Sequence, residues 1–455
     1  MTSVKTTAGT TAIARILRIP DWRLFVAVFC IALGIRVALV FARPDYRWNF
    51  QPEEVRLAVS IAQHGSFADP FGQPTGPSAA SPPVYPFLLS FLIRLFGAGI
   101  GGSLAIALLT CILSSLQYSS MIFLSGGLGI PRVICILAAF LGALTPFQLE
   151  SEMRGRFENT LSACVLIGLT LFTAAWLRRK PSGVRWSVLL GVAWGIAIQI
   201  STSLLPIFAA WMVYGFFRKI RSEASIKPYL LGVTTTVVTI LLLLVPWTIR
   251  NYIQLGSPIW SRDNFGGDLH MAYDDCVAPT MLENMRSGCF YSRHPTGNID
   301  EVIKVRRLGE VEYNRQRKAE ALTWIENHPA RSANLTFLHF LRFWFVDFDK
   351  NNMVLVTTAF MVYFWALTLL GFVGLAIMLR IGHPAGWLLG TGMVAYSLIY
   401  ALHQALARYR YPIYWMTELL AVYAVVWLFQ RFWERRDGMS PAQDRMMHEW
   451  RLAER

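Results

Sequence analysis

Long apolar runs are the feature that most constrains how this chain of 455 residues folds. Hydrophobic residues make up 54% of the sequence and charged residues only 15%, a balance that excludes a water-soluble protein of this length. A helix needs roughly 20 mostly apolar residues to cross a bilayer core, so the sequence predicts an all-α polytopic membrane protein. We expect about ten or more transmembrane helices, near residues 24–42, 102–124, 133–147, 159–177, 185–199, 203–217, 228–248, 353–378, 385–402 and 411–430.

Basic residues predict which helix ends face the cytoplasm, because Lys and Arg are retained on that side. They cluster after expected spans at 178–180, 218–221 and 431–436. The first span then acts as a signal anchor, because no small-residue cleavage site follows it. The expected parts are a cytoplasmic N-terminal arm (1–23), an N-terminal transmembrane module (24–248) with a first outer loop (43–100), an extracytoplasmic loop region (249–352), C-terminal transmembrane helices (353–430) and a cytoplasmic tail (431–455).

The formal net charge of +14 invites a comparison with nucleic-acid-binding proteins. Much of this charge marks topology, and no RNA- or DNA-binding motif accompanies it. We therefore expect no nucleic-acid partner.

The extracytoplasmic loop region carries helical patterns of its own. Apolar residues recur at helical spacing over 308–329, and an amphipathic stretch over 330–345 is expected to lie along the membrane surface. Cys276 and Cys289 lie in the same region. An oxidising compartment would permit a disulfide between them, and the alternative is two unpaired thiols.

The first outer loop opens with a helix that carries two adjacent carboxylates. Pro52 suits its first position, Glu53 and Glu54 suit its first turn, and Gly65 suits its end. On one interpretation the glutamates only start an interfacial helix. On the other, one of them removes a proton from an incoming hydroxyl just outside the bilayer. The glycine- and proline-rich segment that follows indicates a shaped backbone.

Four stretches carry a resemblance to a known family. They are EEVRLAVSIAQHGSFADPFG with the following Pro-x-Tyr-Pro step (53–86), FENTLSACVLIGLTL (157–171), PWTIRNYIQLGSPIWSRDNFGGDL (246–269) and ARYRYPI (407–413). In these stretches and their order, the chain resembles the membrane glycosyltransferases of the GT-C class. The resemblance is to bacterial relatives of protein O-mannosyltransferases and of the lipid A aminoarabinose transferase, in the group of glycosyltransferase family 39.

The resemblance implies a GT-C fold in a multi-pass protein of the bacterial cytoplasmic (inner) membrane, with the active site facing outside. It implies inverting transfer of a single sugar from a polyprenyl-phosphate donor to a hydroxyl acceptor, and the sugar and the acceptor stay open. Partners would be that donor, membrane lipid and the acceptor. No cofactor is required, because the phosphoester already activates the donor, although a divalent cation could bridge acids and phosphate.

The acidic site residues can be matched one at a time. Glu53 falls where the family has its first-loop acid and would be the general base, with Glu54 as its rival; many relatives have Asp there. Glu158 matches the second acid, or else it only starts a helix. A salt-bridge cluster is the alternative for the neighbouring Glu150, Glu152, Arg154 and Arg156.

The leaving phosphate acquires negative charge, so cations are expected beside it. The candidates are Arg408 and Arg410, which lie among tyrosines, and Arg250 and Arg342. The alternatives are anchoring in the aromatic belt and, for Arg250, an end-of-span arginine that reaches the interface. Residues expected to shape the loops or to contact substrate are Tyr85, Asn264 and His270, and no metal site is predicted.

Two other functions stay open on the sequence. One is a flippase or transporter for lipid-linked sugar, and the other is a non-catalytic assembly protein with a GT-C fold. Transporters place charges near the bilayer midplane. Here the apolar runs are almost free of acids, with Arg36 as the main internal charge, which favours chemistry at the membrane surface.

Overall fold

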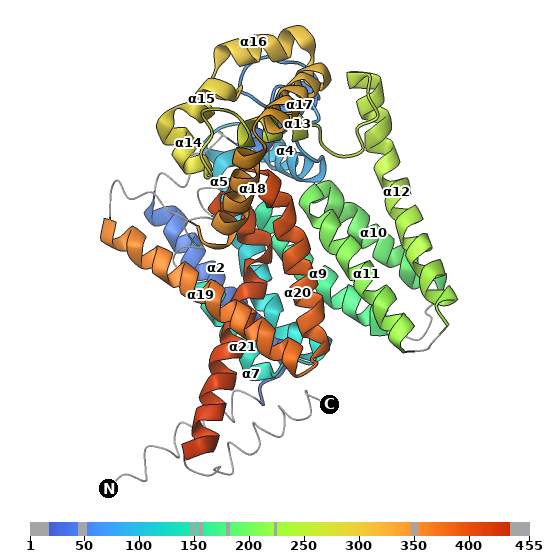
Figure 1. The fold of residues 1–455 in the computed structure, drawn as a ribbon, viewed down its shortest axis with the longest axis vertical. Coiled ribbons are helices and arrows are strands. Elements are labelled where there is room, and N and C mark those ends of the chain that lie inside the picture. The colour runs from blue at the N-terminus through green and yellow to red at the C-terminus, as the bar shows by residue number, and fades with distance from the viewer. Residues whose placement is uncertain are drawn as a thin grey trace.

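The computed structural model describes residues 18–43, 52–145, 149, 152, 158–178, 183–222, 225–346 and 354–436. Regular structure in these ranges is helical, apart from two isolated β-bridges. The predicted all-α class is therefore confirmed. Helices run roughly along the long axis of the molecule, and a group of shorter helices covers one end (Figure 1).

Seven helices of the described ranges are long and apolar enough to cross a membrane. They are α2 (Asp21–Ala42), α5 (Ile100–Ser120, continued by η2, Met121–Phe123, and α6, Leu124–Leu128), α9 (Asn159–Arg178), α12 (Lys227–Leu255), α19 (Val354–Arg380), α20 (Pro384–Ile399, continued by η4, Tyr400–Leu402) and α21 (Tyr411–Arg436). Three further predicted spans are helices, but shorter than a full crossing. These are α7 (Arg132–Leu144, 13 residues), α10 (Val184–Ile200, 17 residues) and α11 (Leu205–Arg221, 17 residues).

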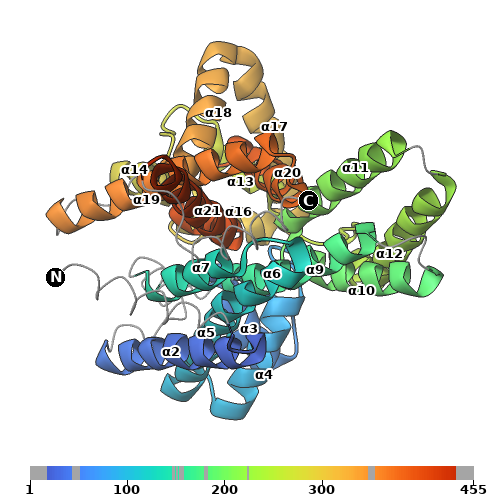
Figure 2. The ribbon, with the colours of Figure 1, turned by 90° about the horizontal axis from the view of Figure 1, so that it is seen from below.

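The spans pack in close pairs, of which α19 with α21, α10 with α12 and α2 with α5 are the most extensive. Figure 2 shows α10, α11 and α12 as a group on one side of the molecule. Small residues let backbones approach, as is usual for helices in membranes. A Cβ at Gly374 of α19, for example, would lie 1.9 Å from the carbonyl oxygen of Leu420 in α21.

A buried ion pair ties the core of the bundle together. Arg36 of α2 is fully buried, and its Nε lies 2.8 Å from a carboxylate oxygen of Glu152. The same guanidinium donates to the carbonyl of Ala143 at the end of α7. Tyr411 of α21 donates to the other oxygen of Glu152 at 2.5 Å. The partner of Glu152 is therefore a span arginine, and Glu150, Arg154 and Arg156 lie outside the described residues.

The shorter helices belong to the two predicted outer loops and lie at one end of the molecule (Figure 1). The first loop gives α3 (Glu53–His64) and α4 (Val84–Phe96). The second loop gives α13 (Phe265–Ala272), α14 (Met281–Ser287), α15 (Cys289–Arg293), α16 (Ile299–Leu308), α17 (Glu310–Asn327) and α18 (Pro329–Trp344). The helices predicted over 308–329 and 330–345 are thus present as α17 and α18.

Replacing Arg36 by Met should destabilise the protein, because it leaves Glu152 buried without its cation. Loss of one partner of such a pair costs about 3–5 kcal/mol in free energy of unfolding. Denaturant titration in mixed micelles measures this loss. Arg23→Met, at an exposed position of α2, is the matched control. Unfolding of Arg36→Met at the wild-type denaturant concentration would contradict the role of the pair.

Candidate active site

Helix α3 presents the two adjacent glutamates at its start. Pro52 is the N-cap, one position earlier than predicted, and Glu53 and Glu54 occupy the first turn, where the helix dipole favours negative charge. Gly65 ends the helix with φ 69°, a left-handed conformation that glycine adopts without steric cost.

Helix α4 fixes α3 in place. Val55 and Ala58 of α3 are fully buried and pack with Tyr85 and Leu89 of α4. Tyr85 is only 3% exposed, so it supports the helix that carries the glutamates. Tyr85 was predicted to shape the loop or to contact substrate; its packing agrees with the first role, and it is not among the residues that line the pocket described below.

Arg250 anchors the first outer loop from the end of α12. Its Nη1 donates to the carbonyl of Ser78 at 2.6 Å and its Nη2 donates to the carbonyl of Phe67 at 2.8 Å. The guanidinium also lies over the rings of Phe67 and Trp247. Both terminal nitrogens are therefore engaged by the loop, which places this predicted phosphate ligand in a supporting position.

Three predicted acids and one predicted arginine form a cluster. Burial, followed by the charges of Glu158 and Glu53, raises the pKa of Glu54 to about 8, although Arg408 opposes the shift. Glu54 comes from the start of α3, Glu158 immediately precedes α9, and Arg408 lies in the short helix η5 (Ala407–Arg410). We call Glu53, Glu54, Glu158 and Arg408 the acid cluster.

A second charged group adjoins the acid cluster. Arg262 donates to Asp268 at 2.8 Å, and Nε2 of His403 lies 3.4 Å from the other oxygen of Asp268. Burial alone would raise the pKa of Asp268, but His403 and Arg262 outweigh it and lower that pKa to about 2. Burial lowers the pKa of Arg262, and Asp268 and Glu158 more than compensate, so the net shift is upward.

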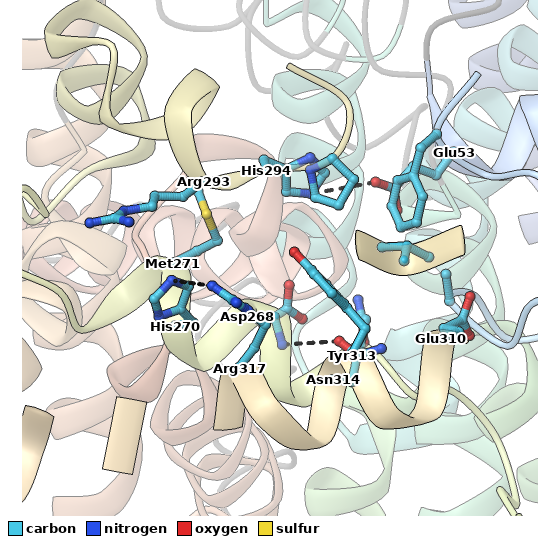
Figure 3. A pocket seen from close by; sticks show the side chains of 16 residues that line it. Glu53, Asp268, His270, Met271, Arg293, His294, Glu310, Tyr313, Asn314 and Arg317 are labelled. Carbon is cyan, nitrogen blue, oxygen red and sulfur yellow. Dashed lines mark hydrogen bonds and ion pairs between the residues drawn. The ribbon is translucent and has the colours of Figure 1, made fainter. Parts of the chain in front are cut away.

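A pocket with a volume of about 50 Å³ opens beside Glu53, between the two outer loops (Figure 3). One oxygen of Glu53 lies 3.6 Å from Nε2 of His294. The ring of His294 stacks on Phe290, with centroids 4.9 Å apart. Other residues of the lining include Asn264, Asp268, His270, Arg293, Glu310 and Arg317.

Asn264 and His270, which were predicted to shape the loops or to contact substrate, line this pocket. Asn264 precedes α13 as its N-cap. His270 is buried, and Nε2 of its ring lies 3.4 Å from a guanidinium nitrogen of Arg317. Burial and then the charge of Arg317 lower the pKa of His270 to about 4, so the ring is neutral at pH 7.

Glu310 joins the pocket to the first outer loop. It is the first residue of α17, and its carboxylate accepts a hydrogen bond of 2.6 Å from the backbone N–H of Ala79. Burial raises the pKa of Glu310 to about 7, although hydrogen bonds from Ser78 and Ala79 oppose the shift.

The other two predicted arginines lie elsewhere. Arg410 is 1% exposed, and its Nη1 donates to the carbonyl of Trp344 and to the hydroxyl of Thr368, both at 2.8 Å. It therefore joins η5 to α18 and α19. Arg342 lies half-buried in the last turn of α18. Of the two arginines in the sequence ARYR, Arg408 is the one that joins the acid cluster.

Several site residues carried little signal in the sequence. Arg262 and Asp268 lie within the stretch 246–269, but nothing there indicated that they pair. His294 and His403 had no metal-ligand spacing and come to their carboxylates from distant segments. Across the described residues no group of three or more His, Cys, Asp or Glu side chains is placed to hold a metal ion. The divalent cation remains a prediction.

One solved structure has a fold similar to that of this chain. The chain is similar to the oligosaccharyltransferase of Archaeoglobus fulgidus, whose crystal structure is of the apo form, with a TM-score of 0.53 and 16% sequence identity. The match covers 94% of this chain and 54% of the archaeal one, so this chain spans about half the length of that protein. The sequence matches no family model and no curated protein sequence. The chain has the GT-C membrane glycosyltransferase fold.

The raised pKa of Glu54 predicts how stability depends on pH. The unfolded chain releases this proton near pH 4.5 and the folded protein near pH 8, so wild-type stability falls between these values. Glu54→Gln removes the penalty and should unfold at a higher temperature than wild type at pH 8, with a smaller difference at pH 5. Thermal unfolding at both values measures this, with exposed Glu326→Gln as the control. An equal difference at both pH values would contradict it.

Proposed function

We propose that the protein is a membrane glycosyltransferase that moves a single sugar from a polyprenyl-phosphate donor to a hydroxyl acceptor, with inversion. The observation that carries the proposal is the acid cluster, in which carboxylates from two outer segments adjoin Arg408 in a chain of GT-C fold. The archaeal counterpart is by name an oligosaccharyltransferase, which supports sugar transfer as the reaction class.

Arg408 would contact the leaving phosphate. Negative charge grows on the phosphate oxygens as the bond to the sugar breaks, and a preplaced cation stabilises that charge most strongly away from bulk water. An arginine guanidinium also matches phosphate oxygens with paired N–H donors. Arg408 lies half-buried beside the carboxylates, which is where these requirements meet.

Glu53 is the better candidate for the general base. A pKa of about 8 keeps Glu54 mostly protonated at pH 7, so Glu54 is poorly placed to accept a proton. Glu53 lines the pocket through which a hydroxyl could approach. In the proposed step the acceptor oxygen bonds to the anomeric carbon, its proton passes to Glu53, and the bond to the phosphate oxygen breaks. Polyprenyl phosphate leaves with the bonding electrons.

We place the site outside the cytoplasm, in the cytoplasmic membrane of a bacterium. Helix α11 ends in a basic turn at the end of the molecule away from α13–α17, as the positive-inside rule requires of the cytoplasmic side (Figure 1). The disulfide between Cys276 and Cys289 suits an oxidising compartment. Membrane lipid would surround the spans, and any role for a divalent cation stays open to test.

A flippase is less well supported. The main charge inside the spans, Arg36, is paired with Glu152 and hydrogen-bonded on several sides, as expected of a structural contact. The titratable residues that line an open pocket belong to the outer loops. A non-catalytic assembly protein would keep the fold without turnover, and the following assay separates that case.

Purified protein should transfer labelled sugar from a member of a panel of synthetic polyprenyl-phosphate sugars. Glu53→Gln should lower kcat by about 10²–10⁴, the usual contribution of a placed base, while the protein stays folded. Arg408→Gln should raise the donor KM. Exposed Glu326→Gln and Arg315→Gln are the matched controls.

Loss of activity in Glu54→Gln but not in Glu53→Gln would move the base to Glu54. Donor binding without turnover in wild type would favour a flippase or assembly role.

A further inference from the structure

A disulfide closes one segment of the second outer loop. Cys276 and Cys289 are bonded, and the segment between them contains α14. Thr280 and Glu283 cap this helix reciprocally, side chain to backbone in both directions. The buried side chain of Asn284 bonds both the N–H and the carbonyl of Ala278. The closed segment is therefore internally ordered as well as covalently joined.

One side of this segment binds the chain that leads to Arg408. Thr280 and Ala405 form a parallel β-bridge. The N–H of Met281 donates to the carbonyl of Ala405 at 3.2 Å, and the N–H of Ala405 donates to the carbonyl of Pro279 at 3.3 Å. Ala405 stands two residues after His403, which contacts Asp268, and three before Arg408.

The other end of the segment reaches Glu53. Helix α15 begins at Cys289 and ends at Arg293, and His294 follows directly. Arg293 forms an ion pair of 3.0 Å with Asp274, which lies just before Cys276. The ion pair and the disulfide therefore join the same two stretches of the chain. The imidazole of His294 then lies 3.6 Å from the carboxylate of Glu53.

We propose that segment 274–294, which is closed by the disulfide and by the Arg293–Asp274 ion pair, is the positioning element of the active site: it sets His294 against Glu53 and the 403–408 segment against the acid cluster. Its residues act through Glu53 and Arg408, and none of them is assigned a chemical step. Opening the disulfide would remove the covalent link between the two ends of the segment and leave the partly exposed Arg293–Asp274 ion pair to hold them, so that both contacts loosen together. The effect on turnover rests on the proposed transferase function, whereas the structural effect does not.

Hydrogen exchange read by mass spectrometry tests the structural part on the full chain in detergent. Oxidised wild type is compared with protein treated with dithiothreitol and with a Cys276→Ser, Cys289→Ser double variant. We expect amides of peptides covering 279–281 and 404–408 to exchange about tenfold faster in both altered forms. Peptides of α2 and α10 serve as internal controls and should not change. Unchanged exchange at 404–408, with reduction verified by thiol labelling, would overturn the proposal.

Transfer kinetics test the consequence for the site. Reduction should raise the donor KM about tenfold through displacement of Arg408, and reoxidation should restore it, whereas a simple loss of active protein leaves KM unchanged. The double variant should show the raised KM and no response to dithiothreitol. Normal KM in the reduced protein would overturn the proposal. Absence of transfer in oxidised wild type, together with the expected exchange pattern, would instead reject the transferase function and leave the positioning role intact.

Discussion

The site depends on placing the buried carboxyl of Glu54 beside Glu158 and Arg408. Burial raises the pKa of Glu54 most, the charge of Glu158 adds to the increase and Arg408 opposes it, and the resulting pKa is about 8. These three residues come from the first outer loop, the start of α9 and the segment before α21. This arrangement requires that three separate parts of the chain keep fixed positions relative to one another. Contacts made by the outer loops hold them there.

The loops achieve that rigidity mainly through polar anchors. Arg250 bonds the backbone of the first loop from the end of α12, and Glu310 bonds it again at Ala79 from the start of α17. Such charge-assisted hydrogen bonds are stronger than neutral ones and are strongest where water is excluded. The spans contribute differently, through close helix pairs and one buried ion pair between Arg36 and Glu152. The polar loops therefore lie on an apolar base of closely packed spans.

Local patterns in the sequence predicted what depends on local physics. The spans, the helix at Glu53 and the helix over 308–329 follow from apolar periodicity and from start and stop residues. The disulfide was one of two alternatives, because spacing cannot show that two cysteines meet; the structure has them bonded. Likewise, Arg408 and Arg410 are equivalent in sequence, yet one joins the acids and the other contacts Trp344. Tertiary packing decides such cases, as it does for Glu53 with His294.

The most direct test of the account is a cryo-EM structure of the protein with a bound polyprenyl phosphate. The proposed function predicts that the phosphate lies within hydrogen-bond distance of Arg408, with the space for the sugar between the phosphate and Glu53. Weaker phosphate density in a structure of the Arg408→Gln variant would support the same assignment. A phosphate bound among the spans or at their basic ends, away from the acid cluster, would contradict the central claim.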